Sequence, residues 1–370
     1  FGAALVLPAA LSIVTNTFHE GAERNTALGI WGRVGALGGT VGLLAGGLLT
    51  TYVGWRSVFF FNVPIGAAAL VLCPKVVPES RAVGVRRRFD VVGAASITAA
   101  LLVVISAVSQ APEVGWAVPQ TEALLSAGAV LLAAFFAIET RVEAPLLPLA
   151  LLRLPTVAGS NAVGFLLGTS FLTFVFLGTL YMQQVLGLSP IAAGAAWTAA
   201  SCTSLAFGGL SQRIVTATSP KAVMTFGMTL IGVAILWAAR APLHGSFWSD
   251  LAGPFVLGGI GTAFAFIPVS IGALSGIGEH HAGVASGMLN TSQNLGSAIG
   301  VAVASSVAAS QLHLVGHHGV AGIAALAGGL RLALLVCGLS ALVAAPTALL
   351  VDRSGPRRKG RRDASWCRRG

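Results

Sequence analysis

The residues of this sequence that could do chemistry are uncharged polar side chains inside long apolar runs. Two runs carry most of them: Asn161, Thr169, Gln183 and Gln184 in or beside one, and Asn290, Gln293 and Asn294 in the other. Asn290 and Gln293, with Ser297, recur at i, i+3 and i+7, which is one face of a helix. Amides and hydroxyls donate and accept hydrogen bonds without charge, so their chemistry would be recognition of a solute. Hydrogen bonding between helices is the alternative.

Two tryptophans and one arginine add to these candidates. Trp31 and Trp197 could stack on an aromatic or cationic solute. Arg33 is a charge within an apolar run. It could reach the headgroups along its flexible stem, or it could face a cavity or a contact between two halves of the molecule.

Sets of residues that would indicate an enzyme or a metal centre are not evident. The sequence contains neither a Ser/His/Asp set nor a nucleotide-binding loop, and its four cysteines are scattered. His313, His317 and His318 form an HxxxHH pattern without an accompanying carboxylate or cysteine. We therefore expect no enzyme activity, no cofactor and no metal.

The composition indicates a membrane protein. The chain is 55% hydrophobic and 9% charged, whereas soluble domains carry about 25% charged residues. A membrane-spanning helix needs about 20 mostly apolar residues. Eleven such runs predict an all-α, polytopic helical bundle: 1–18, 26–49, 57–73, 90–109, 121–138, 157–181, 190–210, 222–239, 251–275, 283–309 and 327–351.

Lysine and arginine predict the orientation of these runs. Eighteen of the 22 basic residues fall in one alternating set of connections, three (Arg56, Arg240 and Arg331) in the other, and Arg33 lies within a run. Because basic residues are retained on the cytoplasmic side, we expect a multi-pass protein of the cell membrane with its C-terminus in the cytoplasm. The basic tail 353–370 is then a partner for anionic lipid rather than for nucleic acid.

The second apolar run (26–49) is rich in glycine. In "GGTVGLLAGG" (38–47), Gly38, Gly42 and Gly46 are four residues apart, a spacing that forms a groove for close approach of another helix. A similar pattern recurs late in the chain, where "GTAFAFIPVSIGALSGIGEHH" resembles "GAALVLPAALSIVTNTFHE" near the start. Such internal repeats are common in transporters.

Several motifs together resemble one family. They are "GIWGRVGALGGTVGLLAGGLLTTYVGWRSVFFFNVPIG" (29–66), "RRRFDVVGA" (86–94), "PLLPLALLRLPTVAGSN" (145–161), "LYMQQVLGLSPIAAG" (180–194) and "AGVASGMLNTSQNLGSAIGVAV" (282–303). In this order they resemble the major facilitator superfamily, specifically its fourteen-span drug–proton antiporter branch of the EmrB/QacA type.

The resemblance implies a register and a motif. The eleven runs would be the fourth to fourteenth spans of that branch, so we expect about three more spans upstream. The family's antiporter motif, G-x-x-x-G-P-x-x-G-G, matches Gly38, Gly42, Gly46 and Gly47, with Leu43 where the family has proline. The implied domains are the rest of an N-terminal bundle (1–74), two inserted spans with basic linkers (75–155), a six-helix C-terminal bundle (156–352) and the tail (353–370).

The resemblance also implies a function. We expect proton-coupled efflux of drugs or small amphipathic or cationic compounds by alternating access, with the small molecule, protons and the lipid bilayer as partners. The predicted spans hold no carboxylate that could couple protons, because the nearest ones, Asp90, Glu122 and Glu139, lie at span ends. The alternatives are transport of one dedicated metabolite and an inactive, truncated membrane remnant or sensor.

Overall fold

The computed structural model describes residues 2–18, 21–77, 90–142, 147, 149–243, 245–277, 282–316 and 322–349. The basic tail, much of the linker before Asp90, and His317 and His318 lie outside these ranges.

Helices make up the regular structure of the described ranges, without a strand among them, and the eleven predicted runs are confirmed as helical. Eight of the helical segments are long and apolar enough to cross a membrane. The bounds are α1 (Gly2–Thr17), α2 (Ala22–Tyr52), α3 (Ser57–Val76), α4 (Val91–Val114), α5 (Pro119–Glu139), α6 (Leu149–Leu152), α7 (Pro155–Leu167), α8 (Thr173–Leu180), α9 (Pro190–Ala217), α10 (Pro220–Ala238), α11 (Ala252–Ala273), α12 (Ala282–Gly316) and α13 (Gly322–Leu349).

Three π-helical turns interrupt or begin these helices. Gly168–Leu172 (η1) joins α7 to α8, Tyr181–Val185 (η2) extends α8, and Phe247–Leu251 (η3) leads into α11. A π turn holds one residue more than an α turn, and such turns often lie at functional sites.

Local sequence signals account for several helix starts. Proline occupies the first position of α5, α7, α9 and α10, where its missing N–H needs no partner. The Asp90 carboxylate accepts a hydrogen bond from the Gly93 N–H (2.8 Å) and caps α4. Ser189 caps α9 in the same way by accepting from the Ala192 N–H (3.3 Å).

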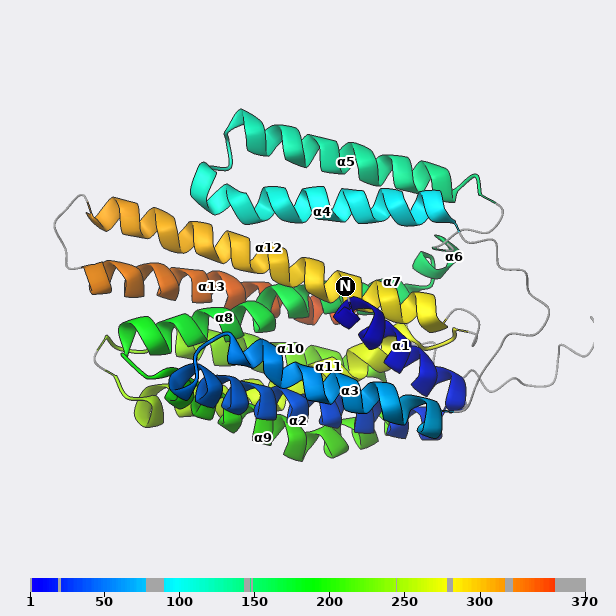
Figure 1. Cartoon of the computed structure of the whole chain (residues 1–370), viewed down its shortest axis with the longest axis horizontal. Coiled ribbons are helices and arrows are strands. Elements are labelled where there is room, and N and C mark those ends of the chain that lie inside the picture. The colour runs from blue at the N-terminus through cyan, green and yellow to red at the C-terminus, as the bar shows by residue number, and fades with distance from the viewer. Residues whose placement is uncertain are drawn as a thin grey trace, which may run out of the picture.

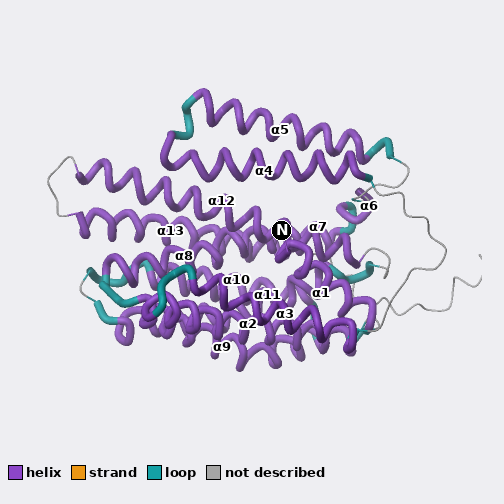
Figure 2. The backbone as a smooth tube through the Cα atoms, in the orientation of Figure 1, coloured by secondary structure: helices purple, strands orange, loops and turns teal. Residues whose placement is uncertain are grey.

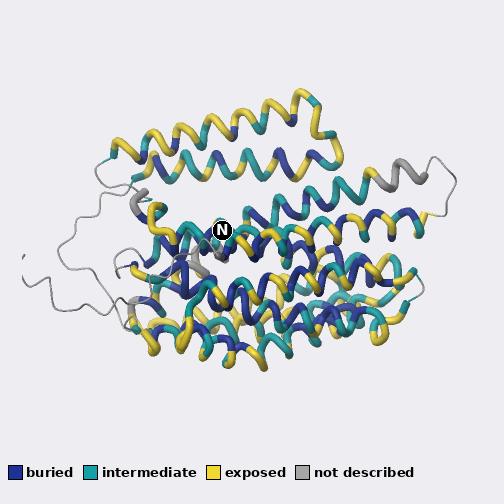
Figure 3. Tube along the Cα trace, turned by 180° about the vertical axis from the view of Figure 1, so that it is seen from behind, coloured by how far each residue is buried: buried dark blue, intermediate teal, exposed yellow. Residues whose placement is uncertain are grey.

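The helices run roughly parallel to the long axis of the molecule (Figures 1 and 2). Helix α2 packs along α9, α9 along α11, α10 along both α11 and α13, and α12 along α13 and α7. Most residues of α11 are buried, whereas none of α3 is, so the core lies around α10 and α11 (Figure 3). The exposed apolar side chains of α3 are what lipid would contact.

Helices α4 and α5 form a hairpin at one edge of the molecule (Figure 1). The pair packs on itself and meets the other helices chiefly through α12. A hydrogen bond from the Trp116 indole N–H to the Ser306 hydroxyl (2.7 Å) ties the tip of the hairpin to α12.

Two details of the sequence prediction change. Helix α3 continues to Val76, three residues beyond the predicted run 57–73. Arg331, counted among the connections, lies inside α13, where its guanidinium donates to the Ala241 carbonyl (Nε to O, 3.1 Å). The Tyr181 hydroxyl donates to the same carbonyl (3.0 Å), so these groups join α13, η2 and the loop after α10.

Candidate functional site

A cavity of about 470 Å³ lies between α2 and the helices α7, α8, α9 and α11, with one contribution from α12. Pockets for drug-sized ligands have volumes of about 300–1,000 Å³. Helix α2 lines the cavity from Trp31 to Leu43, a length of about 18 Å at 1.5 Å per residue. The cavity is therefore long enough for a molecule of several rings.

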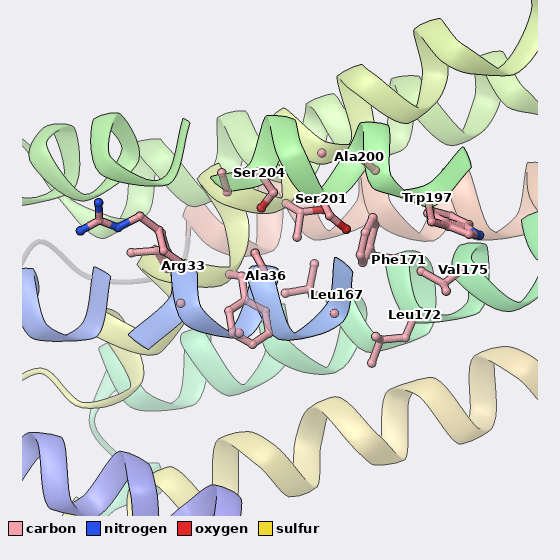
Figure 4. A pocket seen from close by; sticks show the side chains of 18 of the residues that line it. Arg33, Ala36, Leu167, Phe171, Leu172, Val175, Trp197, Ala200, Ser201 and Ser204 are labelled. Atoms are coloured by element: carbon pink, nitrogen blue, oxygen red, sulfur yellow. The ribbon is translucent and has the colours of Figure 1, made fainter. Parts of the chain in front are cut away.

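The lining is mostly apolar. Figure 4 shows Leu167, Phe171 and Leu172 on one side of the cavity and the α9 side chains on another. Arg33 lies at one end of the labelled side chains, and Trp197 lies at the other. The cavity thus has one charged end and one aromatic end.

Aromatic residues form a packed cluster at the Trp197 end. Trp197 is 2% exposed, and its ring centroid is 4.2 Å from that of Phe255 and 5.3 Å from that of Phe174. Its indole N–H donates to the Thr179 hydroxyl (2.9 Å). Trp197 is therefore held in place by this cluster at the edge of the cavity that it lines.

Trp31 lines the cavity from α2. Its ring stacks on Phe266 of α11, with centroids 6.0 Å apart. The two predicted tryptophans thus face one cavity, but each already has an aromatic partner.

Arg33 is half-buried and is the one charged residue among the described residues that line the cavity. Its Nε donates to the Gly29 carbonyl of its own helix at 3.4 Å, which is a long hydrogen bond. Gly208 of α9 leaves room for its stem, since a Cβ there would lie 2.9 Å from the Arg33 Cγ. Its stem therefore lines the cavity, while its guanidinium lies at the outer end and points away from the other labelled side chains (Figure 4).

Gln293 reaches the cavity from α12. Its side chain is 8% exposed, and its Nε2 has no hydrogen-bond partner within the described ranges. The Gln293 carbonyl contacts Gly168 so closely that a side chain on Gly168 would collide with it. The π turn η1 therefore begins where α7 touches the backbone of α12.

The remaining polar candidates do not line this cavity. Asn161 is buried, donates to the Val157 carbonyl (2.8 Å) and accepts from Ser292 (3.1 Å). Thr169 donates to the carbonyls of Phe165 and Gly296 (both 3.0 Å). Their bonds join α7 and η1 to α12, as in the helix-packing alternative.

The four other amides also lie apart from the main cavity. Asn290 and Asn294 donate to the carbonyls four residues before them, at 2.9 and 2.8 Å. Gln183 and Gln184 are exposed at the end of η2. Gln183 does line a second, smaller cavity of about 250 Å³.

The antiporter-motif residues are divided between the two cavities. The second cavity is lined by Gly42, Leu43, Gly46 and Gly47 of α2, together with residues of α8, η2 and α9. Leu43 and Trp197 belong to the linings of both cavities and stand between them. Gly38 lines neither.

Close approach of the α2 and α9 backbones occurs in the second half of this glycine stretch. A Cβ on Gly47 would lie 2.8 Å from the Pro190 carbonyl oxygen, and one on Gly194 would lie 2.5 Å from the Leu43 carbonyl oxygen. At Gly38, Gly42 and Gly46 a Cβ would meet nothing within 4 Å. Within this stretch the two backbones therefore touch at Gly47 and Gly194, and the other motif glycines leave open space.

Three residues of the lining that carry hydroxyls, Ser201, Ser204 and Thr262, were not among the predicted residues. Ser201 and Ser204 of α9 lie on the same helix face as Trp197, at i+4 and i+7. The spacing of Trp197, Ser201 and Ser204 along one face of α9 could therefore have predicted these two serines from the sequence.

Comparison with known families identifies the fold. Residues 1–301 match the model of the Major Facilitator Superfamily. The chain belongs to this superfamily. Its members are membrane transporters, so the chain is a multi-pass membrane protein of the transporter class rather than an enzyme.

Curated Major Facilitator Superfamily relatives include antibiotic exporters. The chain is 34% identical over 350 residues to a cephamycin export protein of Amycolatopsis lactamdurans, with 92% of this chain and 72% of that protein covered. It is 32% identical to a puromycin resistance protein of Streptomyces alboniger, covering 85% and 63%. It is 31% identical to a tetracenomycin C resistance and export protein of Streptomyces glaucescens, covering 84% and 57%. The chain thus spans less than two thirds of the length of the last two.

Proposed function

We propose that the protein exports drug-sized amphipathic compounds. One observation carries the proposal: an apolar cavity of about 470 Å³ lies between α2 and the C-terminal helices of a chain whose relatives are named for export or resistance. A cavity between two groups of helices is the arrangement in which one group rocks against the other around a bound solute. Movement of α2 along α9 would then open the cavity to one side of the membrane at a time.

We further propose that the chain belongs to the fourteen-span drug–proton antiporter branch. The separate α4–α5 hairpin, which contacts the other helices mainly through α12, supports the interpretation of 75–155 as two inserted spans. Coupling to protons rests on the match of Gly38–Gly47 to the antiporter motif. The orientation with basic loops and the C-terminus in the cytoplasm rests on the arginine distribution.

The export proposal can be tested in a bacterial host that lacks its main efflux pumps. Cells that express the chain are loaded with the neutral amphipathic dye Nile red, and efflux is followed by fluorescence after energisation, with and without a protonophore. We expect efflux that the protonophore abolishes. Dye retention equal to that of cells without the protein would refute export, and efflux that ignores the protonophore would refute proton coupling.

A pair of variants on α2 assigns the efflux to the cavity. Ala36 lines the cavity, whereas its neighbour Leu37 is 49% exposed and does not. Ala36→Phe should fill part of the cavity and abolish efflux, while Leu37→Phe should leave it unchanged at equal expression. Equal effects of the two variants would place the transport path elsewhere.

Export of a single compound is the second candidate. Each of the three relatives is named for one antibiotic, which supports a dedicated exporter, whereas a Mycobacterium tuberculosis relative that is 32% identical is named for multidrug resistance and supports a broad one. Resistance conferred against one compound class in a panel of structurally unrelated antibiotics would support the dedicated exporter. Resistance to many of them would exclude it.

A further inference from the structure

We propose that the cavity selects amphipathic anions, meaning compounds with a carboxylate-type group on an apolar ring system, over amphipathic cations. The proposal rests on the proposed export function and adds the charge of the compound exported. It departs from the cationic substrates that the sequence suggests.

The charges around the cavity favour an anion. Arg33 is the sole charged side chain in the described lining. The described carboxylates all lie near helix ends and away from the cavity: Glu23, Asp90, Glu113, Glu122, Glu139 and Asp250. A cationic ligand would therefore enter next to a guanidinium without a counter-charge, while an anion would supply the missing one.

The guanidinium of Arg33 has donors to offer. It lies 11 residues after the start of α2, about 16 Å along a helix of about 46 Å. A hydrocarbon layer of about 30 Å centred on α2 would leave Arg33 about 8 Å inside it. In the described part of the chain its terminal nitrogens have no hydrogen-bond partner, and its Nε has only the long bond to Gly29. A carboxylate can accept two parallel hydrogen bonds from such a group.

Gln293 supplies a second unpaired donor. Its Nε2 is buried without a partner, although buried polar groups in proteins are normally hydrogen-bonded. A ligand carbonyl or carboxylate oxygen would satisfy it once the side chain turns toward the cavity. The same amide also carries an acceptor oxygen, so Gln293 adds a polar contact for the ligand and the charge preference rests on Arg33.

The aromatic rings offer little to a cation. Recognition of a cation by aromatic residues needs open ring faces. Trp31 stacks on Phe266, and Trp197 is 2% exposed between Phe255 and Phe174. These rings form a wall for a ligand's apolar body rather than an open cage.

The α2 side of the cavity suits a flat ring system. Gly35 and Gly39 line it, and a Cβ at either position would meet nothing within 4 Å. A planar ligand can therefore lie against the α2 backbone, with its apolar body toward Phe171 and its anionic group toward Arg33.

Three matched probes test the charge preference: 4-(1-pyrenyl)butanoate, its primary amide and 4-(1-pyrenyl)butylamine. Binding to the full chain in lipid nanodiscs is measured by titration calorimetry, with empty nanodiscs subtracted. We expect the carboxylate to bind about tenfold more tightly than the amine, the scale of one charge-assisted hydrogen-bond pair. Arg33→Gln should weaken the carboxylate about tenfold and change the amide less than twofold. Arg33→Lys should restore part of the loss, and Arg33→Glu should reverse the order of carboxylate and amine.

Arg56→Gln is the matched control, because Arg56 is an exposed arginine at the turn between α2 and α3 that lines neither cavity. It should leave all three affinities unchanged. If the amide binds and Nile red is exported while the amine binds as tightly as the carboxylate, the anion preference is refuted and the export function stands. If the wild-type chain neither binds the amide nor exports Nile red, the export function fails, and this proposal fails with it.

Discussion

Replacement of Gly194 by alanine should force α2 and α9 apart. The new Cβ would lie 2.5 Å from the Leu43 carbonyl oxygen, and an ordinary contact begins at 3.4 Å, so the backbones must separate by about 0.9 Å. Neither atom belongs to a flexible side chain that could turn away. Overpacking of this kind costs about 1–3 kcal/mol, which lowers the unfolding midpoint by roughly 2–6 °C.

Gly42→Ala is the matched control on the facing helix. A Cβ at Gly42 meets nothing within 4 Å, and alanine favours the helix by about 1 kcal/mol over glycine. Thermal unfolding of both purified variants in detergent, together with Nile red efflux, compares them. We expect the Gly194 variant to lose stability and efflux and the Gly42 variant to keep its stability. A Gly42 variant that is destabilised as much as the Gly194 variant would refute the assignment of the helix contact to Gly194.

Three further changes follow from the structure. Leu43→Pro restores the proline of the family motif, and because membrane helices tolerate proline we expect a monodisperse, active protein on size-exclusion chromatography; aggregation would show that this stretch of α2 has diverged from the motif. Trp197→Ala should join the two cavities and raise passive dye leak in de-energised vesicles, whereas Trp197→Phe, which loses only the bond to Thr179, should not; equal leak from both variants would place the barrier elsewhere. A reporter inserted at Trp116, in the turn between α4 and α5, should read external, because the basic residues before and after this hairpin are expected to lie in the cytoplasm. A cytoplasmic signal would contradict the two inserted spans.

The helices were predictable because a membrane leaves few choices. A run of about 20 apolar residues must be helical when lipid cannot satisfy its backbone. The breaks between runs carry their own signals, as Asp90 shows by capping α4 and Pro190 by opening α9. A cap or a helix-starting proline acts on residues next to it in the sequence, so the sequence alone is enough to predict it.

The site was predictable only in part, because a polar residue in an apolar helix need not face a solute. Trp31, Arg33 and Gln293 do line the cavity. Asn161 and Asn290 instead donate to carbonyls four residues earlier in their own helices. A short amide side chain can always find that partner, and the sequence does not tell which amide will do so.

The π turns are a second reason why the residues that line the cavity were only partly predictable from the sequence. Each adds one residue to a helical turn, which rotates the following face by about 100° relative to an α-helix. The turn η1 falls between Asn161 and Gln183, so a face extrapolated from the first along a regular helix misses the second. Nothing in the local sequence marks this insertion, which occurs where Gly168 meets the backbone of α12.

Leu43 and Trp197, which line both cavities, determine where the membrane voltage acts on a transported charge. Where water fills the spaces on both sides of Leu43 and Trp197, the membrane voltage falls mainly across that thin wall. Moving a unit charge across this wall changes its electrostatic energy by about 2.3 kcal/mol at a membrane potential of 100 mV. An anion leaving an inside-negative cell gains this energy, equivalent to a roughly fiftyfold concentration ratio. For the anions proposed above, the membrane voltage would therefore drive export at the same step at which it would hold cations back.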